Sequence, residues 1–202
     1  MPSARDIFNS NMALANEAGS VYDFLKGAVG GPVNYDDILR FWIVNSVSAI
    51  DKLVHDLVRN GMVEIFSGLR TPTPKYLAEP VALSLVNQLM SSQTPPAVVV
   101  FEQSIRAKLK VLTFQDPDKV ADGLSYIWGE GQKWQKIAAA IGMEDQPARV
   151  KLKLIVSRRN AIVHEADQDP ITHEKLSISR AECADVADFL QKVGNAICDL
   201  VA

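Results

Sequence analysis

The sequence has few of the residues that build metal centres and disulfide frameworks. Its 202 residues include two cysteines and three histidines, with no Cys-x-x-Cys or His-x-x-x-His spacing, so a preformed zinc site is not expected. Cys183 and Cys198 lie 15 residues apart on one expected helix. That separation is about 22 Å along the helix axis, which is too far for a disulfide. We therefore expect reduced thiols, no metal and no cofactor.

An excess of positive charge is also missing. The chain carries 21 Lys and Arg against 24 Asp and Glu, a net charge of −3, so it has no general basic field to hold long nucleic acids. The first residues lack the basic start and apolar run of a signal peptide, and no apolar run reaches membrane-spanning length. These features predict a cytoplasmic protein with no membrane partner.

The composition does provide enough apolar sequence for one core. Hydrophobic residues make up 48% and charged residues 22% of the chain, which is the balance of a globular domain rather than of a disordered tail. A length of 202 residues suffices for one sizeable core and does not require a second. We predict a single domain over residues 1–202.

Apolar residues recur with helical spacing between every pair of Gly and Pro clusters, and no alternating strand pattern is present. Longer helices are expected at 3–26, 35–66, 97–114, 147–169 and from 179 onward, and shorter ones at about 79–90, 116–128 and 134–141. The first should end at Gly27 and the Gly30–Pro32 cluster, and Gly61 should fray or kink the second. The expected fold is an all-α bundle of about five long helices with short ones between them.

Three helix starts carry capping signals. Asn34 can cap the second helix, and Asp116 can cap a short helix that has Pro117 at its first position. Ser179 and Glu182 have the spacing of a capping box before the last helix. Residues 68–74 contain two prolines and are expected to form a loop.

The most informative stretch is Ser-Arg-Arg-Asn-Ala-Ile-Val-His-Glu at 157–165, within the helix expected from residue 147. At about 100° per residue, the apolar side chains of this helix form one stripe, and Arg159 lies in the middle of it. The stripe consists of Leu152, Ile155, Val156, Ile162 and Val163. Burying a guanidinium costs several kcal/mol unless a carboxylate or a bound anion pairs with it. Arg159 therefore needs either a structural partner or a ligand.

Other polar residues lie beside Arg159. Asn160 and His164, spaced i and i+4, lie on one edge of the stripe with Lys153 next to them, so these groups can converge on one anion. An arginine, an amide and a histidine suit the handling of a phosphodiester. Lys153 and Arg158 are further candidates for RNA contact, with solvated surface as the alternative for both. For the main group the alternative is a structural Arg159 ion pair and an ordinary surface histidine.

The second expected helix carries a similar pair. Asp51 and His55, spaced i and i+4, lie at the edge of its apolar stripe. If the two helices pack with these edges adjacent, Asp51 can accept a hydrogen bond from Arg159 or His164 and orient it. The alternative is an exposed surface pair that contributes a few tenths of a kcal/mol.

Arg159-Asn160, followed by three residues and then His164, resembles the signature of the HEPN superfamily. Val-His-Glu-Ala at 163–166 with the following Asp167, and Ile-Asp-Lys-Leu-Val-His-Asp at 50–56, further resemble its RiboL-PSP-HEPN subfamily. The resemblance spans residues 35–170. It implies a helical bundle that forms a homodimer, with the motif helices of two chains facing each other across a cleft.

The resemblance also implies an activity. It suggests a metal-independent endoribonuclease of the toxin or stress-defence kind, with RNA as substrate and an antitoxin or regulatory protein as a further partner. His164 would transfer protons, Arg159 would neutralise phosphorane charge, and Asn160 would orient a phosphate oxygen or His164. Two alternatives remain open: a non-catalytic HEPN module that binds a nucleotide or protein, and a structural dimerisation protein with a buried ion pair between Arg159 and a carboxylate such as Asp51.

Overall fold

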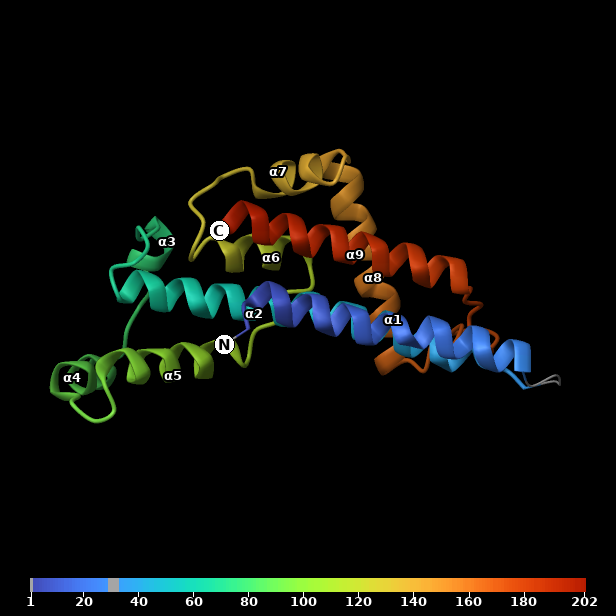
Figure 1. The fold of residues 1–202 in the computed structure, drawn as a ribbon, viewed down its shortest axis with the longest axis horizontal. Coiled ribbons are helices and arrows are strands. Elements are labelled where there is room, and N and C mark those ends of the chain that lie inside the picture. The colour runs from blue at the N-terminus through green and yellow to red at the C-terminus, as the bar shows by residue number, and fades with distance from the viewer. Residues whose placement is uncertain (1, 29–32) are drawn as a thin grey trace.

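The computed structural model describes residues 2–28 and 33–202, and this part of the chain is all-α, as predicted (Figure 1). It contains nine helices and no strands within those ranges. The helices are α1 (Ala4–Ala28), α2 (Asp36–Phe66), α3 (Pro74–Leu77), α4 (Leu83–Ser91), α5 (Ala97–Leu109), α6 (Pro117–Leu124), α7 (Lys133–Ala140), α8 (Asp145–His164) and α9 (Arg180–Val201).

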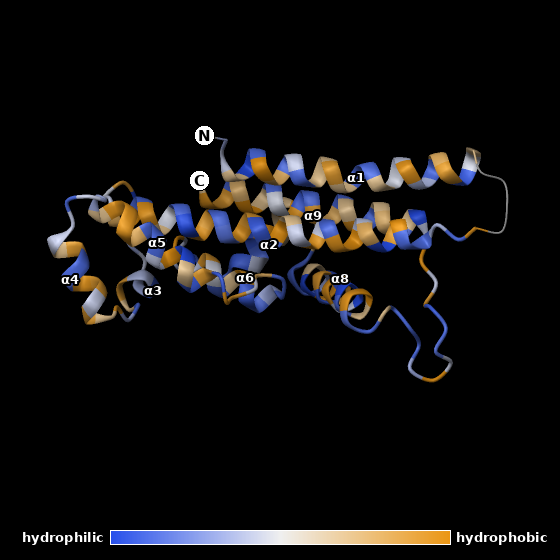
Figure 2. Ribbon diagram, turned by 90° about the horizontal axis from the view of Figure 1, so that it is seen from below, coloured by the Kyte–Doolittle hydropathy of each residue, from blue (hydrophilic) through white to orange (hydrophobic). Residues whose placement is uncertain are grey.

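Three long helices, α1, α2 and α9, lie side by side along the long axis of the molecule (Figures 1 and 2). Their facing apolar side chains form the main core together with residues of α6, α7 and α8. Gly194 of α9 packs against the ring of Phe8 so closely that a Cβ atom there would overlap it, which brings α9 onto α1. The helix α8 crosses this layer steeply and is seen nearly end-on in Figure 2. That crossing places the Arg-Asn…His motif on one side of α2.

The expected capping signals are present. Asp116 accepts a hydrogen bond from the backbone N–H of Asp118 at 2.8 Å, and Ser179 forms a complete capping box with Glu182. The Asn34 side chain accepts from the backbone N–H of Asp36 at 2.7 Å, at the start of α2.

Some predicted boundaries were wrong. The helix α2 does end at Phe66 as expected, and it includes Gly61, where the absent side chain leaves room for Ile127 to pack against the helix. The loop expected at 68–74 leads into the short helix α3, which is capped by Thr73. The helices α4, α5, α6 and α8 are shorter than expected. The helix end expected at Gly30–Pro32 lies outside the described residues.

Both cysteines are buried and free, as the spacing predicted. Burial raises the pKa of the Cys183 thiol to about 11, so it stays protonated near neutral pH. Within the described ranges, no helix combines the length and apolar character needed to cross a membrane.

A buried carboxylate fixes the chain where it leaves α8. Asp167 is fully buried and accepts hydrogen bonds from Arg40 Nε of α2 at 2.7 Å and from Arg158 Nη2 of α8 at 2.9 Å. Arg40 also donates to the backbone oxygen of Leu176 at 2.6 Å, which ties the returning loop to α2. Asp167 adopts a left-handed φ of 55°, a conformation that Asp and Asn tolerate better than most residues. The end of α8 is thereby held against α2.

We predict that Asp167→Asn lowers the stability of the fold by about 3–5 kcal/mol, because it leaves two guanidinium groups without their buried carboxylate while keeping the backbone preference. The measurement is the free energy of unfolding in urea. Asp188→Asn, on the exposed surface of α9, removes the same charge and should stay within about 0.5 kcal/mol of the wild type. Equal losses in the two variants would contradict the role of Asp167.

Candidate functional site

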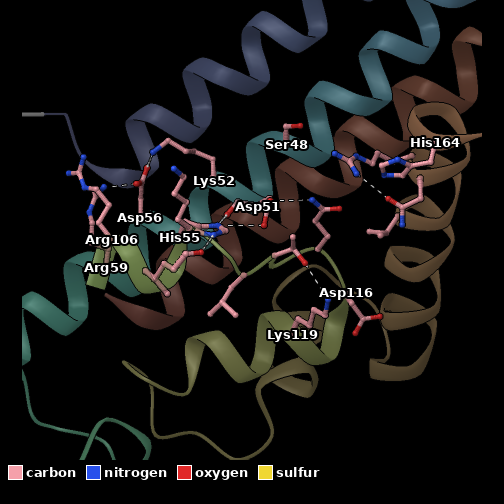
Figure 3. A pocket seen from close by; sticks show the side chains of 18 residues that line it. Ser48, Asp51, Lys52, His55, Asp56, Arg59, Arg106, Asp116, Lys119 and His164 are labelled. Atoms are coloured by element: carbon pink, nitrogen blue, oxygen red, sulfur yellow. Dashed lines mark hydrogen bonds and ion pairs between the residues drawn. The ribbon is translucent and has the colours of Figure 1, made fainter. Parts of the chain in front are cut away.

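A groove of about 1030 Å³ lies where α8 crosses α2 (Figure 3). Its walls come from α2, α5, the loop that follows α5, the start of α6, and the last turns of α8. The groove is lined by Arg159, Asn160 and His164 of α8 together with Asp51 and His55 of α2. The two helix edges that the sequence singled out therefore share one cavity.

Arg159 has no acidic partner in the described part of the chain. Its Nη1 donates to Asn160 Oδ1 at 3.1 Å, and its buried Nε has no hydrogen-bond partner in the described part of the chain. No carboxylate among the described residues lies within ion-pair distance of its guanidinium, so the alternative ion pair with Asp51 does not form within one chain. The partly buried guanidinium is therefore available to an anion that enters the groove.

His164 is the last residue of α8, and its side chain is exposed at the rim of the groove. The backbone N–H of Glu165 closes the final turn on Ala161 at 3.0 Å, and Asp167 then anchors the chain. His164 thus combines a fixed backbone position with a ring that solvent and ligand can reach.

Asp51 holds a wall of the groove. Its Oδ1 accepts from the backbone N–H of Phe114 at 2.6 Å, and its Oδ2 accepts from Gln115 Nε2 at 3.1 Å. Within the described part of one chain, neither Arg159 nor His164 donates directly to Asp51. The reason is that the loop after α5 presents a backbone donor that needs an acceptor.

His55 connects α2 to α5. Its Nδ1 lies 2.8 Å from the backbone oxygen of Asp51, and its Nε2 lies 3.1 Å from that of Leu109. The imidazole also packs edge-on against Phe114, with ring centroids 4.6 Å apart. With both nitrogens next to carbonyl oxygens, His55 supports the groove wall and is poorly placed to exchange protons with a ligand.

The two predicted RNA contacts lie away from the groove lining. Arg158 donates to Asp167 and, at 2.9 Å, to the backbone oxygen of Ser177, so its guanidinium is committed to the loop after α8. Lys153 is exposed, with its Nζ 3.5 Å from Asp118. RNA contact by either residue stays a prediction.

The sequence interpretation missed most of the basic residues of the groove. The lining contains six Lys and Arg side chains and three carboxylates, although the whole chain carries a net charge of −3. The basic residues other than Arg159 are Lys52, Arg59, Arg106, Lys110 and Lys119. They come from three helices and a loop, so the cluster cannot be recognised in any single stretch of the sequence. The groove is a local basic site on an acidic protein.

We predict that Arg159→Met leaves the melting temperature unchanged or raises it, because Arg159 has no ion pair to lose and an apolar side chain suits its stripe. The neighbouring Arg158→Met is the matched control. It breaks charged hydrogen bonds to buried Asp167 and should cost about 1.5–3 kcal/mol. A loss in Arg159→Met as large as in Arg158→Met would mean that Arg159 is structural.

Comparison with known protein families gives one match. The model of the RiboL-PSP-HEPN family matches residues 13–202, a longer span than the 35–170 expected from the motifs. Comparisons with curated proteins and with solved structures gave no match.

Proposed function

Because the chain belongs to the RiboL-PSP-HEPN family, we propose that it is a metal-independent endoribonuclease that cleaves RNA within the α2–α8 groove. The observation that carries this proposal is the unpaired, partly buried guanidinium of Arg159 in a groove that also holds Asn160 and His164. A desolvated cation beside a titratable ring suits a reaction that builds negative charge and moves protons.

The proposed reaction is an attack of a ribose 2′-oxygen on the adjacent phosphorus. The 2′-hydroxyl loses its proton to a histidine base, the new P–O bond closes a 2′,3′-cyclic phosphate, and the P–O5′ bond breaks. The leaving 5′-oxygen takes a proton and departs as a hydroxyl. His164 supplies one of the two proton-transfer steps, since an imidazole can both accept and donate a proton.

Arg159 neutralises the charge that develops on the phosphorane. Its guanidinium can donate two parallel hydrogen bonds to phosphate oxygens, which an ammonium cannot do. Asn160 already accepts from Arg159 at 3.1 Å. It therefore fixes the orientation of the guanidinium, and its amide N–H groups remain available to a phosphate oxygen.

The proposal includes a homodimer as the active form. The solvent-facing side of α8, which also carries His164, exposes Val150 and Leu154, with Leu154 66% exposed. Apolar side chains beside the site favour a second copy of the chain there. The partner's motif helix would then supply a second histidine, one for each proton transfer. A neutralising antitoxin or regulatory protein would act by covering the same opening.

A second function has support from the same geometry. A non-catalytic module could use Arg159 and Asn160 to hold the phosphate of a nucleotide, since these two groups need no proton transfer to bind an anion. The exposed His164 ring favours the nuclease, because phosphate binding alone does not require a titratable group at the rim.

The deciding experiment incubates purified protein with total RNA in EDTA. We predict cleavage by the wild type and a rate lowered about 10²–10⁴-fold in His164→Ala. Arg159→Lys should lose about 10²–10³-fold, because the bidentate phosphate contact is gone. Arg106→Lys, at the opposite end of the groove in Figure 3, is the matched control and should keep most of the activity. Equal rates in the wild type and His164→Ala would refute the assignment.

Expression in a bacterial host tests the toxin form of the proposal. The wild-type chain, produced without a neutralising partner, should slow growth, and His164→Ala should restore it because RNA cleavage is lost. Growth curves at matched protein levels provide the measurement. Identical growth with both chains would favour the binding module.

A further inference from the structure

Two lysines of the groove have no acidic partner among residues 2–28 and 33–202. The side chain of Lys110 makes no hydrogen bond or ion pair within the described residues, and Lys119 Nζ contacts only the hydroxyl of Thr113, at 3.3 Å. Both side chains are exposed. They belong to the loop after α5 and to α6, so they come from other elements than the motif residues of α8.

The three carboxylates that line the groove already have partners within the protein. Asp56 is buried between Lys52 and Arg59, Asp51 binds the loop after α5, and Asp116 caps α6. Lys52 and Arg59 thus share the carboxylate of Asp56. Arg59 and Arg106 also pair with Glu102. Lys110, Lys119 and Arg159 make no ion pair within the described residues, so their charges are available to an anionic ligand.

The uncompensated charges come from different walls of the groove. Figure 3 shows Lys119 on the α6 wall and His164 on the α8 wall, with the groove between them. The volume of about 1030 Å³ is at the upper end of the roughly 300–1,000 Å³ typical of small-molecule sites. One phosphate held at Arg159 would leave the Lys110–Lys119 wall without a counter-charge.

We propose that the groove binds single-stranded RNA through at least two phosphodiesters, the scissile one at Arg159 and a flanking one at Lys110 and Lys119. The inference rests on the proposed function for the first position. Among the described residues that line the groove there is no Phe, Tyr or Trp, so stacking on aromatic rings does not contribute. Recognition is by backbone charge, with strong salt dependence and little base preference.

The test measures binding of all-2′-deoxy oligonucleotides, which cannot be cleaved by 2′-oxygen attack, as fluorescence anisotropy of a labelled dinucleotide and hexanucleotide. The hexanucleotide should bind at least tenfold more tightly than the dinucleotide. In Lys110→Ala/Lys119→Ala the two should bind alike. Raising the salt from 50 to 200 mM should weaken hexanucleotide binding about 2.6-fold more in the wild type than in the double variant, since loss of the one flanking phosphate contact removes a slope of about 0.7.

Two further double variants serve as controls. Lys136→Ala/Lys192→Ala removes the same charge from exposed surfaces of α7 and α9 outside the groove and should bind like the wild type. Lys110→Arg/Lys119→Arg keeps the charge and should retain the length preference. A length preference that survives Lys110→Ala/Lys119→Ala, or an acidic hexapeptide that binds as tightly as the hexanucleotide, overturns the inference.

The same experiment separates this inference from the proposed function. Suppose that the wild type cleaves RNA and that the length preference is unchanged in Lys110→Ala/Lys119→Ala. The flanking phosphate site at the two lysines would then be refuted, and the proposed ribonuclease activity would still stand. Absence of cleavage, together with length-dependent binding that needs both lysines, would refute the ribonuclease activity. The groove would then be a nucleic-acid-binding site without that activity.

Discussion

The arrangement of the site depends on one buried carboxylate between two guanidinium groups. Asp167 joins Arg40 of α2 to Arg158 of α8 and holds the loop that returns to α9. Because α8 ends only three residues before Asp167, this contact fixes both where the helix stops and how it lies on α2. The position of His164 and the outward direction of the Arg159 guanidinium follow from it.

Two adjacent arginines of α8 have different hydrogen-bond partners. Arg158 satisfies its donors on Asp167 and on backbone oxygens, so it stabilises the fold. Arg159, one position along and about 100° round the helix, faces the groove and finds only the Asn160 amide. The charge of Arg158 is compensated by a carboxylate, whereas that of Arg159 is not within the described residues. The same contrast distinguishes Lys52, which pairs with Asp56, from Lys110 and Lys119.

The sequence predicted the features that depend on local periodicity. It did not predict the contacts between segments that are far apart along the chain. Helical spacing indicated the all-α fold, and the positions of Arg159, Asn160 and His164 on one helix indicated that they could act together. The partner of Asp51 was missed because it is the backbone N–H of Phe114, 63 residues further along the chain. Lys110 and Lys119 were missed for the same reason, since the loop and helix that carry them reach the groove only through packing against α2.

The central claim is that Arg159 and His164 act on a phosphodiester whose nucleophile is the neighbouring 2′-oxygen. The most direct measurement is the chemistry of the product ends, read by mass spectrometry after digestion of one defined oligoribonucleotide in EDTA. The account predicts a 2′,3′-cyclic phosphate on one fragment and a 5′-hydroxyl on the other, with an uncleaved substrate when the ribose at the scissile position is replaced by deoxyribose. Fragments with a 3′-hydroxyl and a 5′-phosphate, or cleavage of the deoxyribose substrate, would contradict it.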